Sequence, residues 1–212
     1  MISRDRIYFS TGGFRNLKPV KAIKLLLAND IKNIELSSGK FDLSTRKRIE
    51  KLSKKENIII HNFFPVPKKS FVLNLASNNP DIFKKSLNMI KKNIILSSLN
   101  KLKIYSFHAG FLIDPKIHEL GKQISTQKLQ DRKKTIKLFV KRLKDLSKFA
   151  KKYNVEILIE NNVITKKNLI KFKSNPLLMT TTSEILEIMK KTPNNINLLL
   201  DVGHLKVFSY YF

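Results

Sequence analysis

The sequence has no cysteine among its 212 residues, and its 16 acidic residues are far outnumbered by 42 lysines and arginines. A chain without cysteine forms no disulfide framework and offers neither a thiolate metal ligand nor a thiol nucleophile. Any metal ion that it binds must therefore be held by histidine, aspartate, glutamate or water. The four histidines and the scarce carboxylates become the residues to follow along the chain.

Long apolar runs are also missing. The longest ones, such as residues 58–60 and 198–200, fall far short of the roughly 20 residues that a membrane-spanning helix needs. The first residues include Arg4 and Arg6, but no apolar block and no small-residue cleavage site follow, so the layout of a secretory signal is absent. We therefore expect no membrane segment and a cytoplasmic location.

The formal net charge of +26 ordinarily points to nucleic acid or an anionic membrane surface. Here lysine greatly outnumbers arginine, the residue that specific phosphate and base recognition favours for its bidentate geometry. Lysine is enriched together with asparagine and isoleucine, as AT-rich codons would produce, and it lies on helical segments such as 133–152 rather than between aromatic residues. We interpret the charge mainly as compositional, which favours a small-molecule partner and leaves nucleic acid open.

Short β-like runs alternate with longer segments of helical period, a pattern typical of βα units and a parallel sheet. Six apolar runs predict strands that are covered on both faces. They comprise residues 7–10, 33–37, 58–61, 103–108, 155–160 and 196–201. Five helices are predicted between them: from Pro19 to Asn29, from Ser44 with Ile49 and Leu52, from Pro80 through Ile94, from Gln127 to Tyr153, and a short one after Thr182 or Ser183.

One α/β domain, residues 1–212, is predicted, because no linker-like composition, charge block or low-complexity tract interrupts this series. Long segments follow three of the strands, at 63–79, 108–125 and 161–181, whereas the connections from helix back to strand are short. Long loops at the carboxyl ends of parallel strands build the sites of both open and barrel α/β folds. We therefore expect the functional site on that face.

Polar side chains stand at the carboxyl ends of five predicted strands. They are Glu35, His61, His108, Glu160, and Asp201 with the nearby His204. A single histidine in such a place is more often a hydrogen-bonded structural group, but five strands with this feature argue for a shared site. An unpaired carboxylate at an apolar strand end would cost several kcal/mol, which implies a cation or hydrogen-bond donors opposite it.

Glu160 and Asp201 form the predicted metal pair, because two ionised carboxylates on adjacent strand ends repel each other unless a cation lies between them. The alternative is that each carboxylate caps a nearby helix. The most specific string is Asp201-Val202-Gly203-His204. Gly203 is expected to let the backbone turn sharply and bring His204 back toward the site.

These strand ends resemble the xylose isomerase-like TIM-barrel superfamily of sugar phosphate isomerases and epimerases, to which apurinic endonucleases of the endonuclease IV type also belong. The resemblance covers essentially the whole chain and rests on Ile34-Glu35-Leu36-Ser37, His61-Asn62, His108-Ala109-Gly110, Glu160-Asn161-Asn162 and Leu200-Asp201-Val202-Gly203-His204-Leu205. It implies a parallel (β/α) barrel of the TIM type, with Glu160 and Asp201 as metal ligands and His204 beside substrate or metal. We assign substrate binding to Glu35, His61, His108 and His204.

The enzyme implied by the resemblance is a divalent-metal-dependent sugar or sugar phosphate isomerase or epimerase, with manganese, magnesium, cobalt or zinc as cofactor. The metal, held by Glu160 and Asp201, would polarise a substrate carbonyl or hydroxyl and stabilise the enediolate that forms when a base removes the adjacent proton. Glu160, or a carboxylate outside this sequence, would be that base. His204 is the second residue predicted to take part in catalysis.

An endonuclease IV-like apurinic endonuclease is the alternative enzyme. In that branch, histidines at positions resembling His61 and His108 join the two carboxylates and His204 in the metal cluster. The positive charge of the chain would also favour a phosphate backbone. Against this alternative, residues 161–163 do not match the small-residue, glycine-containing segment that follows the glutamate in that branch.

The number of predicted elements is small for a closed barrel, since a (β/α)8 barrel typically takes about 250 residues. The resembling family completes its metal site from a seventh and an eighth strand, and six parallel strands leave two open sheet edges.

Three hypotheses follow. The first is an enzyme that lacks its last two βα units and is completed by a further C-terminal chain. The second is a non-catalytic binding module that dimerises through its open edge, and the third is an open doubly wound α/β protein with a small-molecule site. No Gly-x-Gly-x-x-Gly or Gly-Lys-Ser/Thr string supports a nucleotide site in the third case.

Overall fold

The computed structural model describes residues 6–14, 16–37, 51, 57–62 and 64–211. Within them six parallel strands form one sheet: β1 (Phe9–Ser10), β2 (Asn33–Leu36), β3 (Asn57–His61), β4 (Ile104–His108), β5 (Glu156–Glu160) and β6 (Ile196–Leu199). The six predicted strands are confirmed. β1 begins later than predicted and β6 ends earlier, at Leu199 instead of Asp201.

The strands lie in the sheet in the same order as along the chain, and every neighbouring pair is parallel. A doubly wound sheet would reverse its strand order at a switch point. The sequential order is that of a barrel-type α/β fold, so the hypothesis of an open doubly wound protein is wrong. β1 and β6 are the edge strands of the described sheet, and a second copy or a further chain at an edge stays a prediction.

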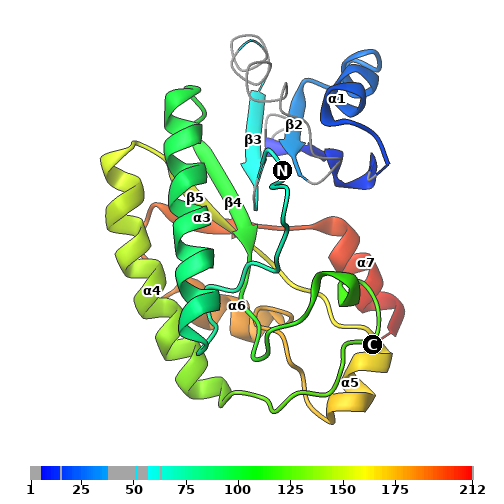
Figure 1. Cartoon of the computed structure of the whole chain (residues 1–212), viewed down its shortest axis with the longest axis vertical. Coiled ribbons are helices and arrows are strands. Elements are labelled where there is room, and N and C mark those ends of the chain that lie inside the picture. The colour runs from blue at the N-terminus through cyan, green and yellow to red at the C-terminus, as the bar shows by residue number, and fades with distance from the viewer. Residues whose placement is uncertain (1–5, 15, 38–50, 52–56, 63, 212) are drawn as a thin grey trace.

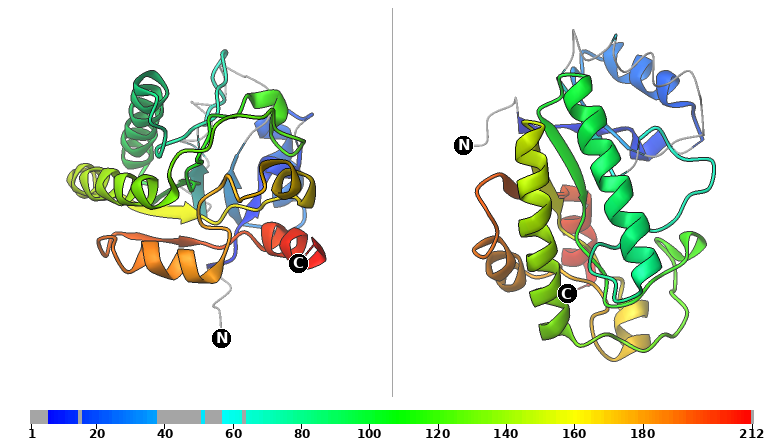
Figure 2. Two further views of the ribbon diagram at one scale, coloured as in Figure 1. Left: turned by 90° about the horizontal axis from the view of Figure 1, so that it is seen from below. Right: turned by 60° about the vertical axis from the view of Figure 1, so that its left-hand side comes forward.

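The α-helices of the described residues are α1 (Pro19–Leu27), α3 (Pro80–Leu99), α4 (Arg132–Lys152), α5 (Lys166–Phe172), α6 (Thr182–Met189) and α7 (Val202–Tyr211). α3, α4 and α6 lie together on one side of the sheet, whereas α5 and α7 lie near the carboxyl ends of its strands, as Figure 1 and the view from below in Figure 2 show. α3 contacts β3 and β4, α4 contacts β5, and α6 contacts β6. Among the described helices none combines the length and the apolar character that crossing a membrane requires.

The start of α4 shows how a local side chain sets a helix boundary. Asp131 accepts a hydrogen bond from the backbone N–H of Lys134 at 2.8 Å and so caps the first turn. Gln127, where the sequence predicted the helix to begin, instead exchanges hydrogen bonds between its side chain and the backbone of Asp114. Residues 127–130 therefore belong to the loop, and the helix begins at Arg132.

The main apolar core lies between the sheet and its helices, and a smaller one lies under the loops. The main core joins the side chains of all strands from β2 to β6 with those of α1, α3, α4 and α6. The smaller cluster consists of Phe111, Ile113, Ile124, Ile164 and Leu177. Burying each such side chain contributes about 1.5–3 kcal/mol, so the long loops after β4 and β5 are held by apolar packing of their own.

Two helices were not predicted from the sequence. α5 lies within segment 161–181, which was predicted to be a loop, and its seven residues are too few for a clear helical period. α7 occupies the apolar end of the chain after Asp201. The helix predicted from Ser44 with Ile49 and Leu52 lies outside the described residues.

Gly110, just after β4, tests the packing of the loops against each other. A Cβ added at Gly110 would lie 2.3 Å from the Cβ of Ala76, far closer than two carbon atoms can approach. Gly110→Ala should therefore lower the free energy of unfolding by about 1–3 kcal/mol, the usual cost of overpacking, as measured by urea denaturation. Gly13→Ala is the matched control, because a Cβ there meets no atom of the described residues within 4 Å. Equal effects of the two substitutions would contradict the close contact.

Candidate functional site

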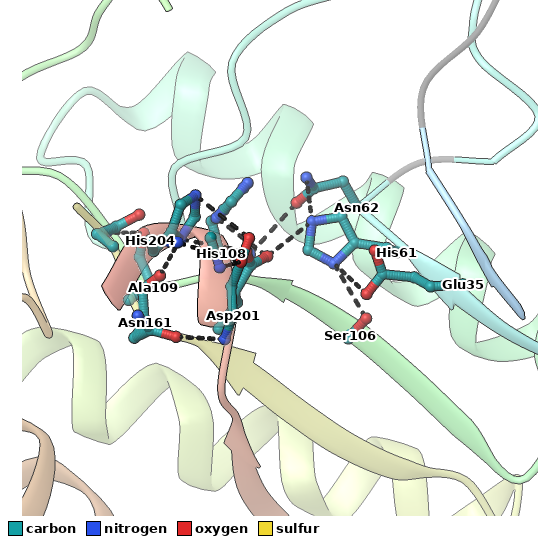
Figure 3. A network of polar contacts seen from close by, with 12 residues as sticks. Glu35, His61, Asn62, Ser106, His108, Ala109, Asn161, Asp201 and His204 are labelled. Atoms are coloured by element: carbon teal, nitrogen blue, oxygen red, sulfur yellow. Dashed lines mark hydrogen bonds and ion pairs between the residues drawn. The ribbon is translucent and has the colours of Figure 1, made fainter. Parts of the chain in front are cut away.

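A buried carboxylate at the end of β5 is surrounded by imidazole groups from three other elements. Glu160 Oε2 lies 3.0 Å from His61 Nε2 and 3.2 Å from His108 Nδ1. Glu160 Oε1 lies 3.4 Å from Nδ1 of His204, and Figure 3 shows how the three imidazoles approach from β3, β4 and α7. The side chain of Glu160 is only 6% exposed. A charged carboxylate at this depth requires close partners, and the imidazoles provide them.

The register of the parallel sheet brings these residues together. His61 pairs with Ser106 in β4, and His108 pairs with Glu160 in β5. Glu160 in turn pairs with Leu199, the last residue of β6. Because these four strands end at the same level, the side chains at their ends meet at one edge of the sheet.

His61 is held on the side of its ring that faces away from Glu160. Its Nδ1 lies 3.0 Å from Ser106 Oγ and 3.7 Å from Glu35 Oε2. Burial by itself would lower the pKa of His61, but the carboxylates of Glu160 and Glu35 outweigh this and raise the pKa to about 9. Glu35 thus contacts the cluster through His61, and its role in substrate binding stays a prediction.

Asn62, the residue after His61, links two of the histidines. Its backbone is left-handed, with φ 53°, a conformation that asparagine adopts more readily than most residues. The side-chain Nδ2 lies 2.7 Å from His61 Nε2, and Oδ1 accepts a hydrogen bond of 3.3 Å from the backbone N–H of His108. The carbonyl oxygen of Asn62 accepts hydrogen bonds from the Tyr105 hydroxyl and the Asn93 amide, which hold this conformation.

The buried Nδ1 of His108 lies within ion-pair distance of Glu160, but in this orientation it makes no hydrogen bond to any described residue. Burial is the largest cause that lowers the pKa of His108 to about 4. Glu160 opposes this shift, and the neighbouring imidazoles of His61 and His204 add to it. His108 is therefore neutral at pH 7, which is the form of imidazole that binds a metal ion.

Asp201 precedes α7 instead of ending a strand, and its two oxygens have different partners. Oδ1 accepts hydrogen bonds from the backbone N–H groups of Gly203 at 2.6 Å and His204 at 3.2 Å, so Asp201 caps α7. Oδ2 lies 3.5 Å from His204 Nε2 and faces the cluster. A Cβ added at Gly203 would lie 3.0 Å from Asp201 Oδ1. Glycine at this position therefore leaves space for the Asp201 side chain to cap the first turn of α7. Gly203 lies within the helix, so the sharp turn expected there from the sequence is wrong.

Asn161 connects β5 with the start of α7. Its side-chain oxygen accepts a hydrogen bond of 2.7 Å from the backbone N–H of Asp201. Its carbonyl oxygen lies 2.7 Å from Nδ1 of His204, so the proton of His204 resides on Nδ1. Nε2 of His204 is then the ring nitrogen that faces Asp201 and is left to interact with a metal ion or a proton.

The donor atoms of the cluster fit a divalent metal ion. Burial by itself would raise the pKa of Glu160, but the three imidazoles hold it well below the ordinary value, so Glu160 is ionised. Two groups of ligand atoms share Glu160, and within each group the atoms lie no more than 4.8 Å apart: His61, His108 and Glu160, and Glu160, Asp201 and His204. Carboxylate and imidazole donors together suit zinc and neighbouring transition metals.

The six predicted site residues form one connected cluster, although their individual roles stay predictions. Three further residues that hold the histidines, Asn62, Ser106 and Asn161, were assigned no role from the sequence. Asn62 directly follows a buried strand, where asparagine often adopts a left-handed turn, and this is a signal that could have identified it. Ser106 lies inside the apolar pattern of β4 and offers no such signal.

A cavity of about 320 Å³ opens beside the cluster. His108, His204 and Asn62 line it on the cluster side, and the long segments after β3, β4 and β5 form its other walls. This volume is at the lower end of the range for small-molecule sites. The segments that were expected to build a site therefore enclose a space of suitable size next to the candidate metal ligands.

A parallel sheet in barrel order, with carboxylates and imidazoles at its carboxyl edge, defines a barrel-type α/β protein with a candidate metal centre. The family described as xylose isomerase-like TIM barrel matches residues 21–210, and the chain belongs to this family. The resemblance found in the sequence is thereby confirmed. Among curated proteins, none matches this chain.

Several solved structures share the fold. A D-tagatose 3-epimerase-like protein is 17% identical with a TM-score of 0.65 over 93% of this chain and 65% of its own. An L-ribulose 3-epimerase is 16% identical, with a TM-score of 0.64 over 95% of this chain and 62% of its own. Endonuclease IV from Thermus thermophilus is 12% identical, with a TM-score of 0.51 over 93% of this chain and 62% of its own. At these identities the likeness concerns the fold, and the chain spans less than two thirds of the length of these structures.

The raised pKa of His61 predicts how the stability of the metal-free protein depends on pH. Protonated His61 stabilises the fold, and this contribution is complete below about pH 6.5, the ordinary histidine pKa. It is lost as the pH rises to about 9, the pKa in the folded state. The free energy of unfolding, measured by urea denaturation in the presence of a chelator, should fall by on the order of 3 kcal/mol over this range. His61→Gln should lack most of this fall, and the same pH dependence in both proteins would contradict the assignment.

Proposed function

We propose that the protein is a divalent-metal-dependent sugar isomerase or epimerase that acts by proton transfer at a carbon next to a carbonyl. The observation that carries the proposal is the convergence of Glu160, Asp201 and the three histidines beside a cavity of small-molecule size. Two solved structures with this fold, a D-tagatose 3-epimerase-like protein and an L-ribulose 3-epimerase, support it.

Glu160 and Asp201 would hold the metal ion, with His61 and His108 on the other side of Glu160 and His204 beside it. A divalent ion bound there polarises a substrate carbonyl or hydroxyl and favours the negative charge that develops when the adjacent carbon loses its proton. The number of imidazole donors favours zinc, manganese or cobalt over magnesium, which prefers oxygen ligands.

His204 is the group best placed to move the proton. It lines the cavity, and the carbonyl of Asn161 keeps its proton on Nδ1, so Nε2 can accept another. Glu160 was the base expected from the sequence, but its lowered pKa makes it a weak one and suits a ligand better. We therefore assign proton transfer to His204 and metal binding to Glu160.

Replacement of Glu160 tests the metal centre. Glu160→Gln removes the charge shared by both ligand groups and should weaken binding of divalent metal by at least about a hundredfold, since even loss of an outer partner costs 10–100-fold. Turnover of ketoses should disappear with it. Metal content by mass spectrometry and proton exchange at the substrate carbon in D2O are the measurements.

Glu156→Gln is the matched control, because Glu156 lies at the opposite end of the same strand and its side chain forms a hydrogen bond only with Asn197 among the described residues. It should leave metal content and turnover unchanged. Undiminished metal binding by Glu160→Gln would remove Glu160 from the ligand set and contradict the proposal.

An apurinic endonuclease of the endonuclease IV type is the second candidate, favoured by a specific observation. Both His61 and His108 reach Glu160, which makes the cluster richer in histidine than the carboxylate pair predicted from the sequence. The net charge of +26 would aid binding to a phosphate backbone.

Duplex DNA with one abasic site separates the two candidates. The endonuclease predicts strand cleavage and a binding constant that falls steeply with salt, with a log–log slope of about −0.9 for each phosphate contacted. The isomerase predicts no cleavage at any salt concentration. If the wild type cleaves this DNA and Glu160→Gln does not, the isomerase is rejected in favour of the endonuclease.

A further inference from the structure

The cavity beside the cluster has an apolar end that the proposed chemistry does not explain. Its apolar lining includes Phe71, Val72, Leu73, Phe111, Ile124 and Leu177. Phe111, Ile124 and Leu177 belong to the small apolar core under the loops, and Val72 packs against it. This wall is therefore a continuation of a packed core and keeps its shape without a ligand.

Most hydrogen-bonding side-chain atoms around that end are already engaged with the protein. Asn162 Nδ2 donates to the carbonyls of Ala109, Gly110 and Leu178. Both side-chain atoms of Asn168 are bonded, with Oδ1 accepting from the Ile124 N–H and Nδ2 donating to the Lys122 carbonyl. A hydroxyl group of a ligand placed there would lose water and find few donors or acceptors in return.

Glu119, the remaining carboxylate of the cavity wall, is also engaged. Its two oxygens accept hydrogen bonds from the backbone N–H groups of Lys116, at 2.7 Å, and Ser125, at 2.9 Å. Hydrogen bonds from Ser125 and Lys116 lower its pKa to about 2, so it is ionised at pH 7. Lys122 is the one lysine or arginine that lines the cavity within the described residues. A wall with one exposed cation and a fixed carboxylate is a poor site for a phosphate group, which needs several donors or charges.

The cluster end of the cavity has the opposite character. His108 and His204 line it with ring faces 5.7 Å apart between centroids, and their side chains are 31% and 22% exposed. A ligand in this cavity would therefore meet polar, metal-binding groups at one end and hydrocarbon at the other.

From this polarity we infer that the substrate is a deoxy sugar, with vicinal oxygen atoms at the cluster and a methyl group or deoxy carbon against Val72, Ile124 and Leu177. The inference rests on the proposed function and adds the substrate class to it. A sugar phosphate does not match the wall, because it would place two negative charges beside Glu119. An acylamino sugar does not match it either, because the N–H and C=O of its amide would meet polar groups that are already hydrogen-bonded within the protein.

Matched ketohexoses test the inference by binding alone. For the fructo, tagato, psico and sorbo configurations, the ketohexose, its 6-deoxy form and its 6-phosphate are titrated by calorimetry into protein loaded with Mn²⁺ or Zn²⁺. In at least one configuration the 6-deoxy form should bind about tenfold more tightly than the parent sugar and the 6-phosphate, because the parent buries a hydroxyl without a partner. A tighter phosphate, or no 6-deoxy sugar that binds, would overturn the inference.

Val72→Thr places a hydroxyl in the wall at nearly constant side-chain shape. It should reduce the preference for the 6-deoxy form over the parent sugar to less than about threefold. Val20→Thr, at a half-buried position of α1 outside the cavity, should keep the full preference. Unfolding midpoints of both variants verify that the fold is retained.

The outcome separates this inference from the proposed function. Ketose turnover without a preference for deoxy sugars would overturn the inference and leave the isomerase intact. The protein could instead prefer deoxy sugars, lose this preference in Val72→Thr, and exchange no substrate proton. That result would support the inference and reject the isomerase.

Discussion

An ionised carboxylate under the carboxyl edge of the sheet is the constraint on which the site depends. Glu160 is nearly inaccessible to water, and burial alone would push it toward the neutral form. It stays charged because histidines at the ends of β3 and β4 and at the start of α7 approach its two oxygens. Burial, with a smaller contribution from the neighbouring imidazoles, keeps His108 neutral, whereas the carboxylates of Glu160 and Glu35 keep His61 protonated. A divalent ion would relieve this imbalance of charge by replacing protons.

The register of the parallel sheet produces this arrangement. Strands that pair in parallel and in sequential order bring His61, His108 and Glu160 to one level from three segments of the chain that are about 50 residues apart. α7 then brings Asp201 and His204 to the same place from beyond the last described strand. The cap of α7 and the candidate metal site share Asp201, so the position of that helix and the geometry of the site are linked.

Asparagine side chains organise the loops over the sheet. Asn74 donates to the carbonyls of Phe111 and Ile113 and accepts from the N–H groups of Ala76 and Phe111, which fastens the segment after β3 to the segment after β4. Asn162 fastens the segments after β4 and β5 in the same way. An amide both donates and accepts, so a single side chain can satisfy several buried backbone groups of two loops. The cavity walls are held by these contacts.

The sequence by itself determined the six strands, most of the helices and the polar residues at the strand ends, because apolar periodicity and abrupt polar ends are local features. It predicted that Glu35, His61, His108, Glu160, Asp201 and His204 lie on one face. Only the tertiary structure decided that Glu160 is their centre, that Asp201 both caps α7 and faces the cluster, and that Asn62, Ser106 and Asn161 orient the rings. The decisive contacts join separate segments: Ser106 reaches His61 from the neighbouring strand, and the Asn161 carbonyl reaches His204 from the end of β5. No local pattern encodes such contacts, and the apolar end of the cavity likewise exists only where three loops meet.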